Sequence, residues 1–582
     1  MSYSSKNVAA GADRNSPGEV FAPRVFGVTL LLAGALSAAP ALAQTPQTRP
    51  DAGQTLRESE KSLPTVPAAP EEPTVFMPVD PRVNNGADSI SIGEVKEFRI
   101  TGAGLIPSQE LMVVLEPWLH RPLKFSDLKD ASDAVSRAYR DRGYPVVRAY
   151  IPEQTLENNV VEITVMASRL GSITLNNNSN IATDRLKSRF DHLPAGSVLR
   201  TDPLERSLLL VQDLAGVASV SATLQPGENA GETNAVVSVE RAPLIGGSAD
   251  LDNYGNRYTG AYRAGATINV NSPAGYGDQL IGRVQATDEK LLYGRFSYRF
   301  PIGNDGLAVG AGVSKSRYQL GGSFAPLDAN GTARASNVFV SYPFIRSRLF
   351  SLAGTATLEN KALEDRIDAI DSVTNKTMRQ ITASLSASGL FPDGGGYSAT
   401  AAVSTGDLNI KGEVAKLIDD VSARSNGSFS KLAYSLSAVV PLSRSWSMLA
   451  SANGQVGNKN LDSSEKFSLG GADAVRAYPQ GEATGDDGFL LSSEIRYAFP
   501  VPGPSLMLLG AFIDYGVIKI NHSPYLSDEN KRRLSAIGLS LNWSMPDDFV
   551  IKATLARKLG TEASTADLDR SYRFWLQGVK SF

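Results

Sequence analysis

The side chains that could carry out acid–base, nucleophilic or metal chemistry are few in this chain and far apart. The 582 residues include no cysteine and only three histidines, His120, His192 and His522, which show no zinc-ligand spacing and lie near no nucleophile motif. No phosphate-binding loop of the form G-x-x-x-x-G-K-[ST] is present. The acidic pairs Asp419-Asp420 and Asp486-Asp487 are interpreted as solvated loop residues rather than calcium ligands. The sequence therefore predicts no catalytic centre, no metal site and no cofactor, and we do not expect an enzyme.

One carboxylate, Asp514, stands in a segment where its surroundings restrict it. Between Leu506 and Val517 the chain alternates, and one set of positions is uniformly apolar: Met507, Leu509, Ala511, Ile513, Tyr515 and Val517. Asp514 falls in the other set, together with Phe512 and Gly516. In a strand that crosses a bilayer, a carboxylate facing hydrocarbon costs about 2 kcal/mol or more at the midplane. Asp514 is therefore predicted to face the interior of a closed barrel.

The same alternation runs from about Ala249 to Phe582 and predicts the element that holds Asp514. One example is the set Leu280, Gly282, Val284 and Ala286, followed by Leu292, Gly294, Phe296, Tyr298 and Phe300, with polar residues interleaved. Successive side chains of a strand point to opposite faces, so each segment has one apolar wall and one polar wall. Residues 249–582 are predicted to form an all-β transmembrane barrel, because only closed sheets and helices satisfy the backbone in lipid.

Prolines mark the turns of this barrel and give a strand count. They follow apolar strand ends at Asn271-Ser-Pro273, Phe300-Pro301, Tyr342-Pro343, Phe391-Pro392, Val440-Pro441, Phe499-Pro500 and Met545-Pro546. Proline donates no ladder hydrogen bond and belongs at strand ends. Seven short turns separate eight hairpins, which predicts about 16 antiparallel strands with both ends in the periplasm. The longer stretches 317–333, 360–377, 407–429 and 457–487 are then surface loops.

The N-terminal region predicts export. Lys6, Arg14 and Arg24 precede the apolar run Val25–Leu36 and the small-residue site Ala41-Leu42-Ala43, so residues 1–43 are interpreted as a signal peptide. No later run reaches the roughly 18 apolar residues of a spanning helix. Residues 44–92 form a proline-rich linker, for which we favour an extended tether, although the proline-free stretch 54–63 is also compatible with a short helix that could plug the pore. Export without spanning helices indicates a Gram-negative outer membrane.

Residues 93–242 follow a soluble α+β pattern twice, as β-α-α-β-β units at 93–168 and 169–242. In the first unit, Ser108 is expected to cap the first helix. This order resembles the POTRA domains that precede outer-membrane barrels in the periplasm. The resemblance implies that these units bind a client through a strand edge or a groove, for which the stripe Leu208–Leu214 is a candidate face. The alternatives are ordinary core packing for that stripe and a mere spacer role for both units.

The longest gap between turns contains a loop motif, Leu469-Gly-Gly-Ala-Asp-Ala followed by Val475, Arg476, Ala477 and Tyr478. Together with Phe512-x-Asp514-x-Gly516, it resembles the VRGY/F loop and the F-x-D-x-G strand of two-partner secretion transporters, the TpsB family of ShlB/FhaC-type haemolysin secretion/activation proteins. The resemblance implies that the loop folds into the lumen and that Arg476 pairs with Asp514, with Glu494 and Arg496 extending the network. The alternative is that Arg476 is a solvated loop residue. Ala477 replaces the usual glycine, which puts the backbone of the tip in question.

These motifs imply an outer-membrane translocase that secretes a large unfolded exoprotein, captured by the POTRA domains and passed through the barrel without nucleotide. The expected partners are a TpsA-like exoprotein, outer-membrane lipid and the barrel assembly machinery. The amphipathic C-terminal strand, with aromatic Phe582 as its final residue, resembles the signal that this machinery reads. The net charge of −3 gives no support to nucleic-acid binding. Two rival functions stay open: a BAM-type assembly factor for other barrels, and a passive porin. The exoprotein and the oligomeric state are not given by the sequence.

Overall fold

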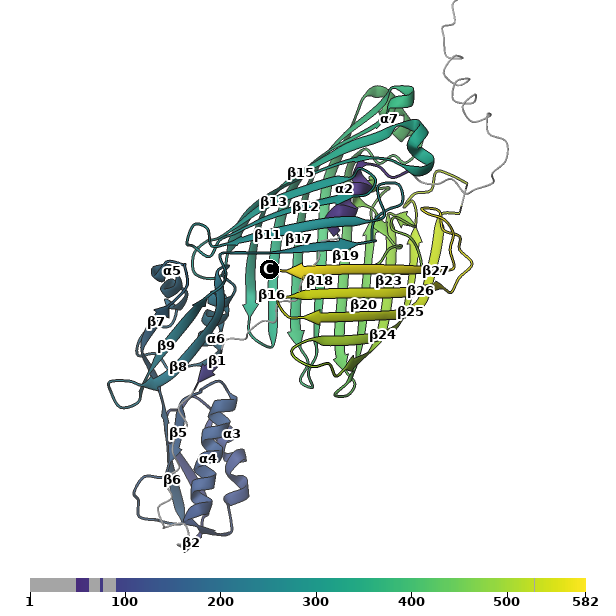
Figure 1. Cartoon of the computed structure of the whole chain (residues 1–582). Helices are drawn as coiled ribbons and strands as arrows, with labels where there is room; N and C mark the ends of the chain where they lie inside the picture. Colours follow the sequence, from purple (N-terminus) through teal and green to yellow (C-terminus); the bar gives the residue numbers. More distant parts are fainter. Residues whose placement is uncertain (1–48, 62–73, 77–90, 528) are drawn as a thin grey trace, which may run out of the picture. The chain divides into compact units, whose positions relative to one another are not determined.

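The computed structural model describes residues 49–61, 74–76, 91–527 and 529–582. Its largest element is a closed barrel of sixteen antiparallel strands (Figure 1). In barrel order these are β10 (Ile245–Asp252), β11 (Arg263–Asn271), β12 (Gln279–Thr287), β13 (Leu292–Pro301), β14 (Ala308–Gln319), β15 (Ala329–Arg346), β16 (Phe350–Ile367), β17 (Ser372–Leu390), β18 (Gly396–Lys411), β19 (Gly427–Pro441), β20 (Trp446–Gly457), β23 (Asp487–Phe499), β24 (Leu506–Lys519), β25 (Lys531–Met545), β26 (Phe549–Lys558) and β27 (Tyr572–Ser581). The predicted fold class and strand count are confirmed.

The barrel closes by pairing of its first and last strands. β10 runs antiparallel to β27, with Asp250 opposite Val579, and the backbones of Gly247 and Phe582 exchange two hydrogen bonds of 2.9 and 3.0 Å. Closure leaves no unpaired sheet edge toward lipid, which is the condition for crossing a bilayer with strands. All seven predicted turns fall between consecutive strands. Six of the seven prolines are the last residue of a strand or follow it within two residues, as expected from the missing backbone donor of proline, whereas Pro343 lies inside β15 at an irregularity in its register with β16.

The two faces of the barrel strands differ in the way that the alternation predicts. On β24, Ile513 and Tyr515 are 51% and 44% exposed on the outer wall, whereas Phe512 and Asp514 are buried inside. On β12 the outward Val284 is exposed and the inward Arg283 is buried, where it forms an ion pair with Asp250 at 2.8 Å. On these two strands the charged side chains thus lie on the inside, and the apolar side chains meet lipid.

The first α+β module contains β3 (Glu97–Gly102), α3 (Ser108–Leu115), α4 (Phe125–Asp141), β5 (Val147–Tyr150) and β6 (Val160–Ala167), with the small strands β2 (Ser91–Glu94) and β4 (Pro122–Lys124) and the 3-10 turn η1 (Glu116–Trp118). Its sheet has the order β3-β6-β5, and both helices pack on the core of the module. The expected cap at Ser108 is wrong. Pro107 occupies the N-cap position, no side chain caps the helix, and Ser108 is its first helical residue.

The second module contains β7 (Arg169–Asn177), α5 (Thr183–Lys187), η2 (Ser188–Phe190), α6 (Thr201–Gln212), β8 (Val217–Pro226) and β9 (Glu232–Arg241). A segment of the linker, β1 (Thr74–Phe76), adds to this sheet in parallel with β8, which gives the order β1-β8-β9-β7. The candidate client stripe is not available as a surface. Leu208 and Leu214 are buried in the core of the module, as the core-packing alternative has it.

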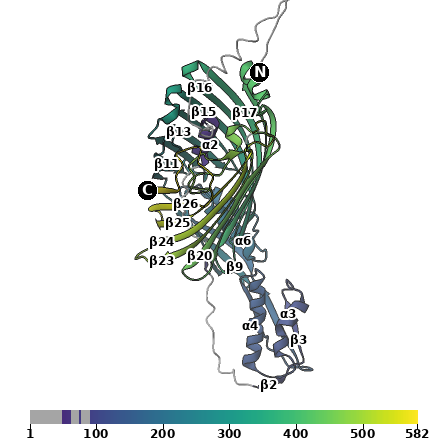
Figure 2. The ribbon, with the colours of Figure 1, turned by 90° about the vertical axis from the view of Figure 1, so that its right-hand side faces the viewer.

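The helix α2 (Ala52–Lys61) lies inside the barrel (Figures 1 and 2). Its residues Ala52 and Leu56 are buried against inward side chains of the barrel wall, including Tyr293, Tyr318 and Leu363. The preference for an extended tether is therefore wrong for residues 52–61, where the helical alternative holds. The predicted signal peptide and most of the remaining linker lie outside the described residues. Among the described helices, none is long and apolar enough to cross a membrane.

The surface loops carry the remaining short elements. These are η3 (Gly322–Leu327), η4 (Asp368–Ile370), α7 (Glu413–Asp420), η5 (Ser463–Glu465), β21 (Phe467–Ser468) and β22 (Thr484–Gly485). The last three belong to the loop between β20 and β23, which is the sixth surface loop of the barrel and is called L6 below.

Candidate functional site

L6 is a surface loop by connectivity, yet its tip is buried in the barrel. β21 and β22 pair as a short hairpin, and beyond them Leu469, Val475, Ala477 and Tyr478 each have no exposed surface. Within the tip, the backbone N–H of Val475 donates to the carbonyl of Leu469 at 2.8 Å, and the N–H of Tyr478 donates to the carbonyl of Val475 at 3.0 Å. Apolar tip residues pack against inward residues of β24, β25 and β26. The loop is therefore a folded part of the lumen rather than a solvated one.

Glycines permit the close approaches that this packing requires. Gly471 has φ +130°, and a Cβ on Gly470 would lie 2.3 Å from the carbonyl oxygen of Pro479. On the facing strand, a Cβ on Gly516 would lie 2.6 Å from the side chain of Leu469. The last glycine of the F-x-D-x-G motif thus makes room for the loop tip.

Arg476 reaches Asp514 with two parallel hydrogen bonds. Its Nη2 donates to Oδ1 at 2.9 Å and its Nε donates to Oδ2 at 3.0 Å, and its backbone N–H adds a third bond to Oδ2 at 3.1 Å. Asp514 is fully buried, and the hydroxyl of Ser492 donates to its Oδ1 at 2.7 Å. Such a fork is the geometry in which arginine and a carboxylate bind most strongly and most specifically.

The other predicted members of the network are in place as well. Nη1 of Arg476 lies 2.7 Å from Oε2 of Glu494, and Nε of Arg496 lies 2.8 Å from Oε1 of the same carboxylate. The hydroxyl of Ser540 donates to Glu494 at 2.8 Å. The guanidinium carbon of Arg476 also sits 3.2 Å from the ring centroid of Phe512, where the ring face favours a cation. The structure thus brings the loop motif and the F-x-D-x-G strand motif into direct contact.

Burial and charge act in opposite directions on Arg476. Burial alone would lower the pKa of its guanidinium, but the hydrogen bonds and charges of Asp514 and Glu494 outweigh burial and raise the pKa above its ordinary value. Arg476 is therefore a permanent cation, and its desolvation is compensated by two carboxylates. Removing either partner would leave an uncompensated buried charge.

The two residues after Arg476 fix the tip in the lumen. Ala477 is not among the described residues with positive φ, so alanine fits this position without backbone strain, and its side chain is buried. The hydroxyl of Tyr478 donates to the carbonyl of Glu562 at 3.3 Å, and Nζ of Lys558 lies 4.4 Å from the centroid of its ring. The glycine of the family pattern is thus replaceable here because the conformation does not need it.

Three contacts at the tip were missed by the sequence reasoning. The indole N–H of Trp575 donates to the carbonyl of Arg476 at 2.7 Å, which ties the tip to the last strand of the barrel. Glu482, fully buried, pairs with Arg532 and accepts the backbone N–H of Ala566 at 2.8 Å. The alternation of side chains along β25 and β27 places Arg532 and Trp575 on the inner face. The sequence therefore shows that these two residues could contact the loop, but not which loop groups they bind.

The base of L6 is held by a second set of buried ion pairs. Glu465 lies 2.6 Å from Lys361 and 2.8 Å from Lys431, and Asp462 lies 2.8 Å from Lys376. Burial would raise the pKa of Glu465, but the two ammonium groups outweigh it and lower the pKa to about 2. The first part of the loop and its tip are therefore both bound to the inner wall by compensated charges.

The interpretation of the acidic pairs as solvated loops is wrong for two of their four residues. Asp486 is fully buried, pairs with Lys466 at 2.9 Å and accepts the backbone N–H of Leu461 at 3.0 Å. Asp419 is also buried and accepts hydrogen bonds from the residues that follow α7. Each carboxylate organises its own loop by satisfying backbone donors. In the described part of the chain, no group of His, Cys, Asp or Glu residues could hold a metal ion.

The helix α2 meets L6 inside the barrel. Nη1 of Arg57 donates to the carbonyls of Ser463 and Lys466, both at 2.6 Å. The two segments are so close that a Cβ on Gly53 would lie 2.7 Å from the backbone nitrogen of Ser464. The N-terminus of α2 contacts the wall, where the N–H of Ala52 donates to Asp365 at 2.8 Å. The helix therefore fills lumen space beside the loop.

The remaining sequence-predicted residues lie apart from this site. Phe582 is 67% exposed at the end of β27, beside β10. His522 lies 3.0 Å from Asp487 at the mouth of the barrel, His192 lies 3.3 Å from Ser207 in the second module, and neither belongs to a catalytic arrangement. The structure brings none of them to the Arg476–Asp514 pair.

Comparison with known proteins identifies the family. Residues 231–545 match the family model described as haemolysin secretion/activation protein ShlB/FhaC/HecB, which is more than half of the chain. The chain belongs to this family. Residues 94–168 match the ShlB-type POTRA domain, so the first module is a POTRA domain, and the second shares its β-α-α-β-β order. Membership makes the chain an outer-membrane transporter of two-partner secretion with periplasmic POTRA domains, in a family of transporters rather than enzymes.

Individual relatives agree with this assignment. The chain is 29% identical over 490 residues to the heme/hemopexin transporter protein HuxB of Haemophilus influenzae, covering 82% of this chain and 85% of the relative. Its fold is similar to that of CdiB from Escherichia coli, with a TM-score of 0.66 at 21% identity, over 87% of this chain and 93% of CdiB. It also resembles BamA from Haemophilus ducreyi lacking POTRA domains 1–3, with a TM-score of 0.51 at 14% identity, over 84% of this chain and 100% of BamA. The likeness to the BAM-type alternative is thus one of fold alone.

Proposed function

We propose that Arg476 and Asp514 hold the tip of L6 in the lumen as a fixed part of the path along which an unfolded exoprotein leaves the cell. The observation that carries this proposal is the forked pair of 2.9 and 3.0 Å between a loop arginine and a fully buried strand carboxylate. With the tip in place, the inner wall presents hydrogen-bonding groups and charges, over which an extended chain can pass without sticking to an apolar surface. No nucleotide is required if folding of the exoprotein outside prevents its return.

A secretion assay tests this role. Arg476→Ala is expected to abolish release of the exoprotein, which we expect to be encoded next to this gene, while the barrel remains in the membrane and resists heat in detergent. The matched control is Arg366→Ala, which removes an exposed arginine paired with Asp368 at 3.2 Å on the same barrel. Normal secretion by the Arg476→Ala variant would refute the role.

We further propose that the POTRA domains capture the exoprotein by adding its extended segment to a sheet edge. In the first module, β3 and β5 are edge strands of the order β3-β6-β5. In the second, the linker segment β1 already pairs with β8, with Thr74 opposite Ser221. An edge that accepts three residues of the linker as a parallel strand has the geometry to accept a client strand instead.

The helix α2 is proposed to plug the pore at rest. It occupies the lumen beside L6, and Ala52 and Leu56 bury their side chains against the wall. An exoprotein that passes through the same lumen must displace the helix, so the described arrangement corresponds to the resting state.

Two further partners are proposed on the C-terminal strand. The outward face of β27 carries Tyr572, Phe574 and Leu576, which are exposed and apolar and would meet outer-membrane lipid. The terminal Phe582 is exposed as well, as a signal read by the barrel assembly machinery must be. Phe582→Ser is expected to lower the amount of barrel in the membrane without changing secretion per barrel.

A further inference from the structure

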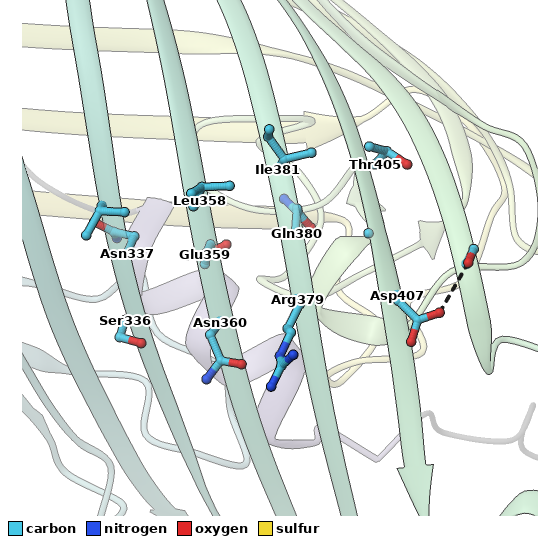
Figure 3. Close-up of a pocket in the computed structure, with 13 residues that line it drawn as sticks. Ser336, Asn337, Leu358, Glu359, Asn360, Arg379, Gln380, Ile381, Thr405 and Asp407 are labelled. Carbon is cyan, nitrogen blue, oxygen red and sulfur yellow. Dashed lines mark hydrogen bonds between the residues drawn. The ribbon is translucent and has the colours of Figure 1, made fainter.

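The outer wall of the barrel carries a groove that divides apolar from polar side chains. It has a volume of about 670 Å³ and lies across β15 to β19. Figure 3 shows Leu358 and Ile381 along one side of it and Asn360, Arg379 and Asp407 along the other. Leu358 and Ile381 are 55% and 46% exposed, on the face that meets lipid.

The strand registers place this boundary in one row around the barrel. Asn360 lies opposite both Ser336 and Arg379, and Arg379 lies opposite Asp407. Along each strand, about 10 residues separate the periplasmic turn from this row, which is the length that a strand needs to cross the hydrocarbon region. It is followed toward the cell exterior by residues that are mostly polar. The groove is therefore at the level of the outer-leaflet headgroups.

Two cations face each other beside this groove with no anion between them. Lys315 on β14 and Arg334 on β15 are directly opposite on the outer face, and both are exposed. Within the described residues, neither they nor Arg379 take part in an ion pair or a side-chain hydrogen bond. Like charges in directly opposite positions destabilise a sheet, so an external anion would be bound favourably here.

The acidic groups on this part of the outer face do not neutralise the cluster. Asp407 is opposite Arg379, but its carboxylate accepts the hydroxyl of Ser428 at 3.2 Å and forms no ion pair with the arginine. Glu364 lies opposite Thr332 and Asn375 instead of a cation. Lys315, Arg334 and Arg379 together with these two carboxylates leave an excess of positive charge.

We propose that Lys315, Arg334 and Arg379 bind the phosphate groups of a phosphorylated lipid of the outer leaflet, whose acyl chains lie along the apolar side of the groove. Arg334 and Arg379 flank β16, so strand spacing places them roughly 10 Å apart across the sheet. Long arginine side chains at that separation can contact one headgroup that carries two phosphates, each with charge-assisted hydrogen bonds. The apolar row of Val338, Leu358 and Ile381 below them supplies the contact for the chains.

Binding of a defined lipid to the full-length protein in detergent tests this site. The probe is bisphosphorylated lipid A, measured by native mass spectrometry, with dephosphorylated lipid A and inorganic phosphate as comparisons. The variant Lys315→Gln, Arg334→Gln, Arg379→Gln is expected to bind the probe about 100-fold more weakly, since each basic residue near an anionic surface contributes about fivefold. Dephosphorylated lipid A is expected to bind the wild type as weakly as the probe binds the triple variant.

The control is Arg366→Gln, a cation on the same face of β16 that is already paired with Asp368. It is expected to bind the probe as the wild type does. Heat-resistant migration of the triple variant in detergent checks that its barrel is intact. The proposal is overturned if an intact triple variant binds the probe within twofold of the wild type. It is equally overturned if the dephosphorylated lipid binds as tightly as the probe, or if inorganic phosphate competes as well as the lipid does.

Discussion

The tip of L6 and the helix α2 both lie in the lumen, but they are attached to the wall in different ways. Arg476 makes forked hydrogen bonds to Asp514 and a 2.7 Å contact to Glu494. The ion pairs of the α2 segment with the wall are longer, at 3.8 Å between Glu60 and Arg295 and 4.0 Å between Asp51, which precedes the helix, and Lys376. The short contacts of α2 with the wall, from the N–H of Ala52 to Asp365 at 2.8 Å and from the hydroxyl of Ser314 to Glu60 at 2.9 Å, each contain only one charged group. Ion pairs of poor geometry contribute little. The comparison indicates that the tip of L6 is permanently attached to the wall, whereas α2 can leave the lumen.

The bonds between α2 and L6 agree with this distinction. Arg57 donates to two backbone carbonyls of the loop, and these acceptors carry no charge. If α2 leaves, the carbonyls of Ser463 and Lys466 can bond to water in the vacated lumen at small cost. If Arg476 leaves, the buried carboxylate of Asp514 loses the cation that compensates it.

The largest effect is expected from Asp514→Ala. The variant leaves the guanidinium of Arg476 facing Glu494 alone, and breaking a buried pair by removing one partner costs about 3–5 kcal/mol. We expect a clear drop in the temperature at which the barrel unfolds in detergent, together with loss of secretion. Asp393→Ala, in an exposed periplasmic turn, is the control and is expected to match the wild type. An unfolding temperature unchanged by Asp514→Ala would show that the loop tip is not held by charge.

A smaller effect, and one on the pore rather than on stability, is expected from Gly53→Leu. Even a Cβ at this position would lie 2.5 Å from Oγ of Ser463 and 2.7 Å from the backbone of Ser464, and overpacking of this kind costs about 1–3 kcal/mol. We expect α2 to leave the lumen and the conductance in planar bilayers to rise, while secretion continues. Lys61→Ala, at the exposed end of the helix, is expected to leave the conductance unchanged. Wild-type conductance in Gly53→Leu would mean that α2 is as firmly held as L6.

Trp575→Phe should weaken the attachment of the tip by about 1 kcal/mol, because it removes one donor to a carbonyl that is part of a larger network. A modest decrease of the unfolding temperature with normal secretion is the expected outcome. A decrease of the unfolding temperature as large as that of Asp514→Ala would show that the last strand, rather than the Arg476–Asp514 pair, holds the loop tip.

The smallest effect is a pH dependence of the plug. Burial raises the pKa of Glu58 above its ordinary value, and neighbouring cations, Arg57 first, only partly oppose this. Because the pKa of Glu58 is raised in the docked helix, its neutral carboxyl stabilises docking. This stabilisation is complete below about pH 4, where the carboxyl is protonated in both states, and it is lost as pH rises through the pKa of the docked state. Conductance should therefore increase with pH in the wild type and depend less on pH in Glu58→Gln. A conductance that falls with rising pH would contradict this role of Glu58.

The barrel could be predicted from the sequence because its cause is local. A period of two along each strand decides which side chains meet lipid, so the sequence alone places Asp514 inward, and six of the seven prolines mark strand ends. The pairing of Arg476 with Asp514 came from the resemblance of the two motifs to a known family, since a loop of this length does not reveal which way it folds.

The missed features all depend on contacts between distant segments. Asp486 reads as a solvated acid in a polar loop, and only folding shows that it is buried beside Lys466. The helix α2 is short and polar, and it is stable because its buried residues meet the barrel wall. One signal was available: Lys361 and Lys376 face inward on β16 and β17, and buried cations require carboxylates from a loop that reaches them.

The most direct test of the account is a double-mutant cycle on the unfolding of the barrel in detergent, with Arg476→Ala, Asp514→Ala and the two combined. We predict strong coupling, with the double variant more stable than the sum of the single effects implies, because each substitution alone leaves a buried charge without its partner. Additive effects of the two substitutions would contradict the claim that this pair holds the loop inside the barrel.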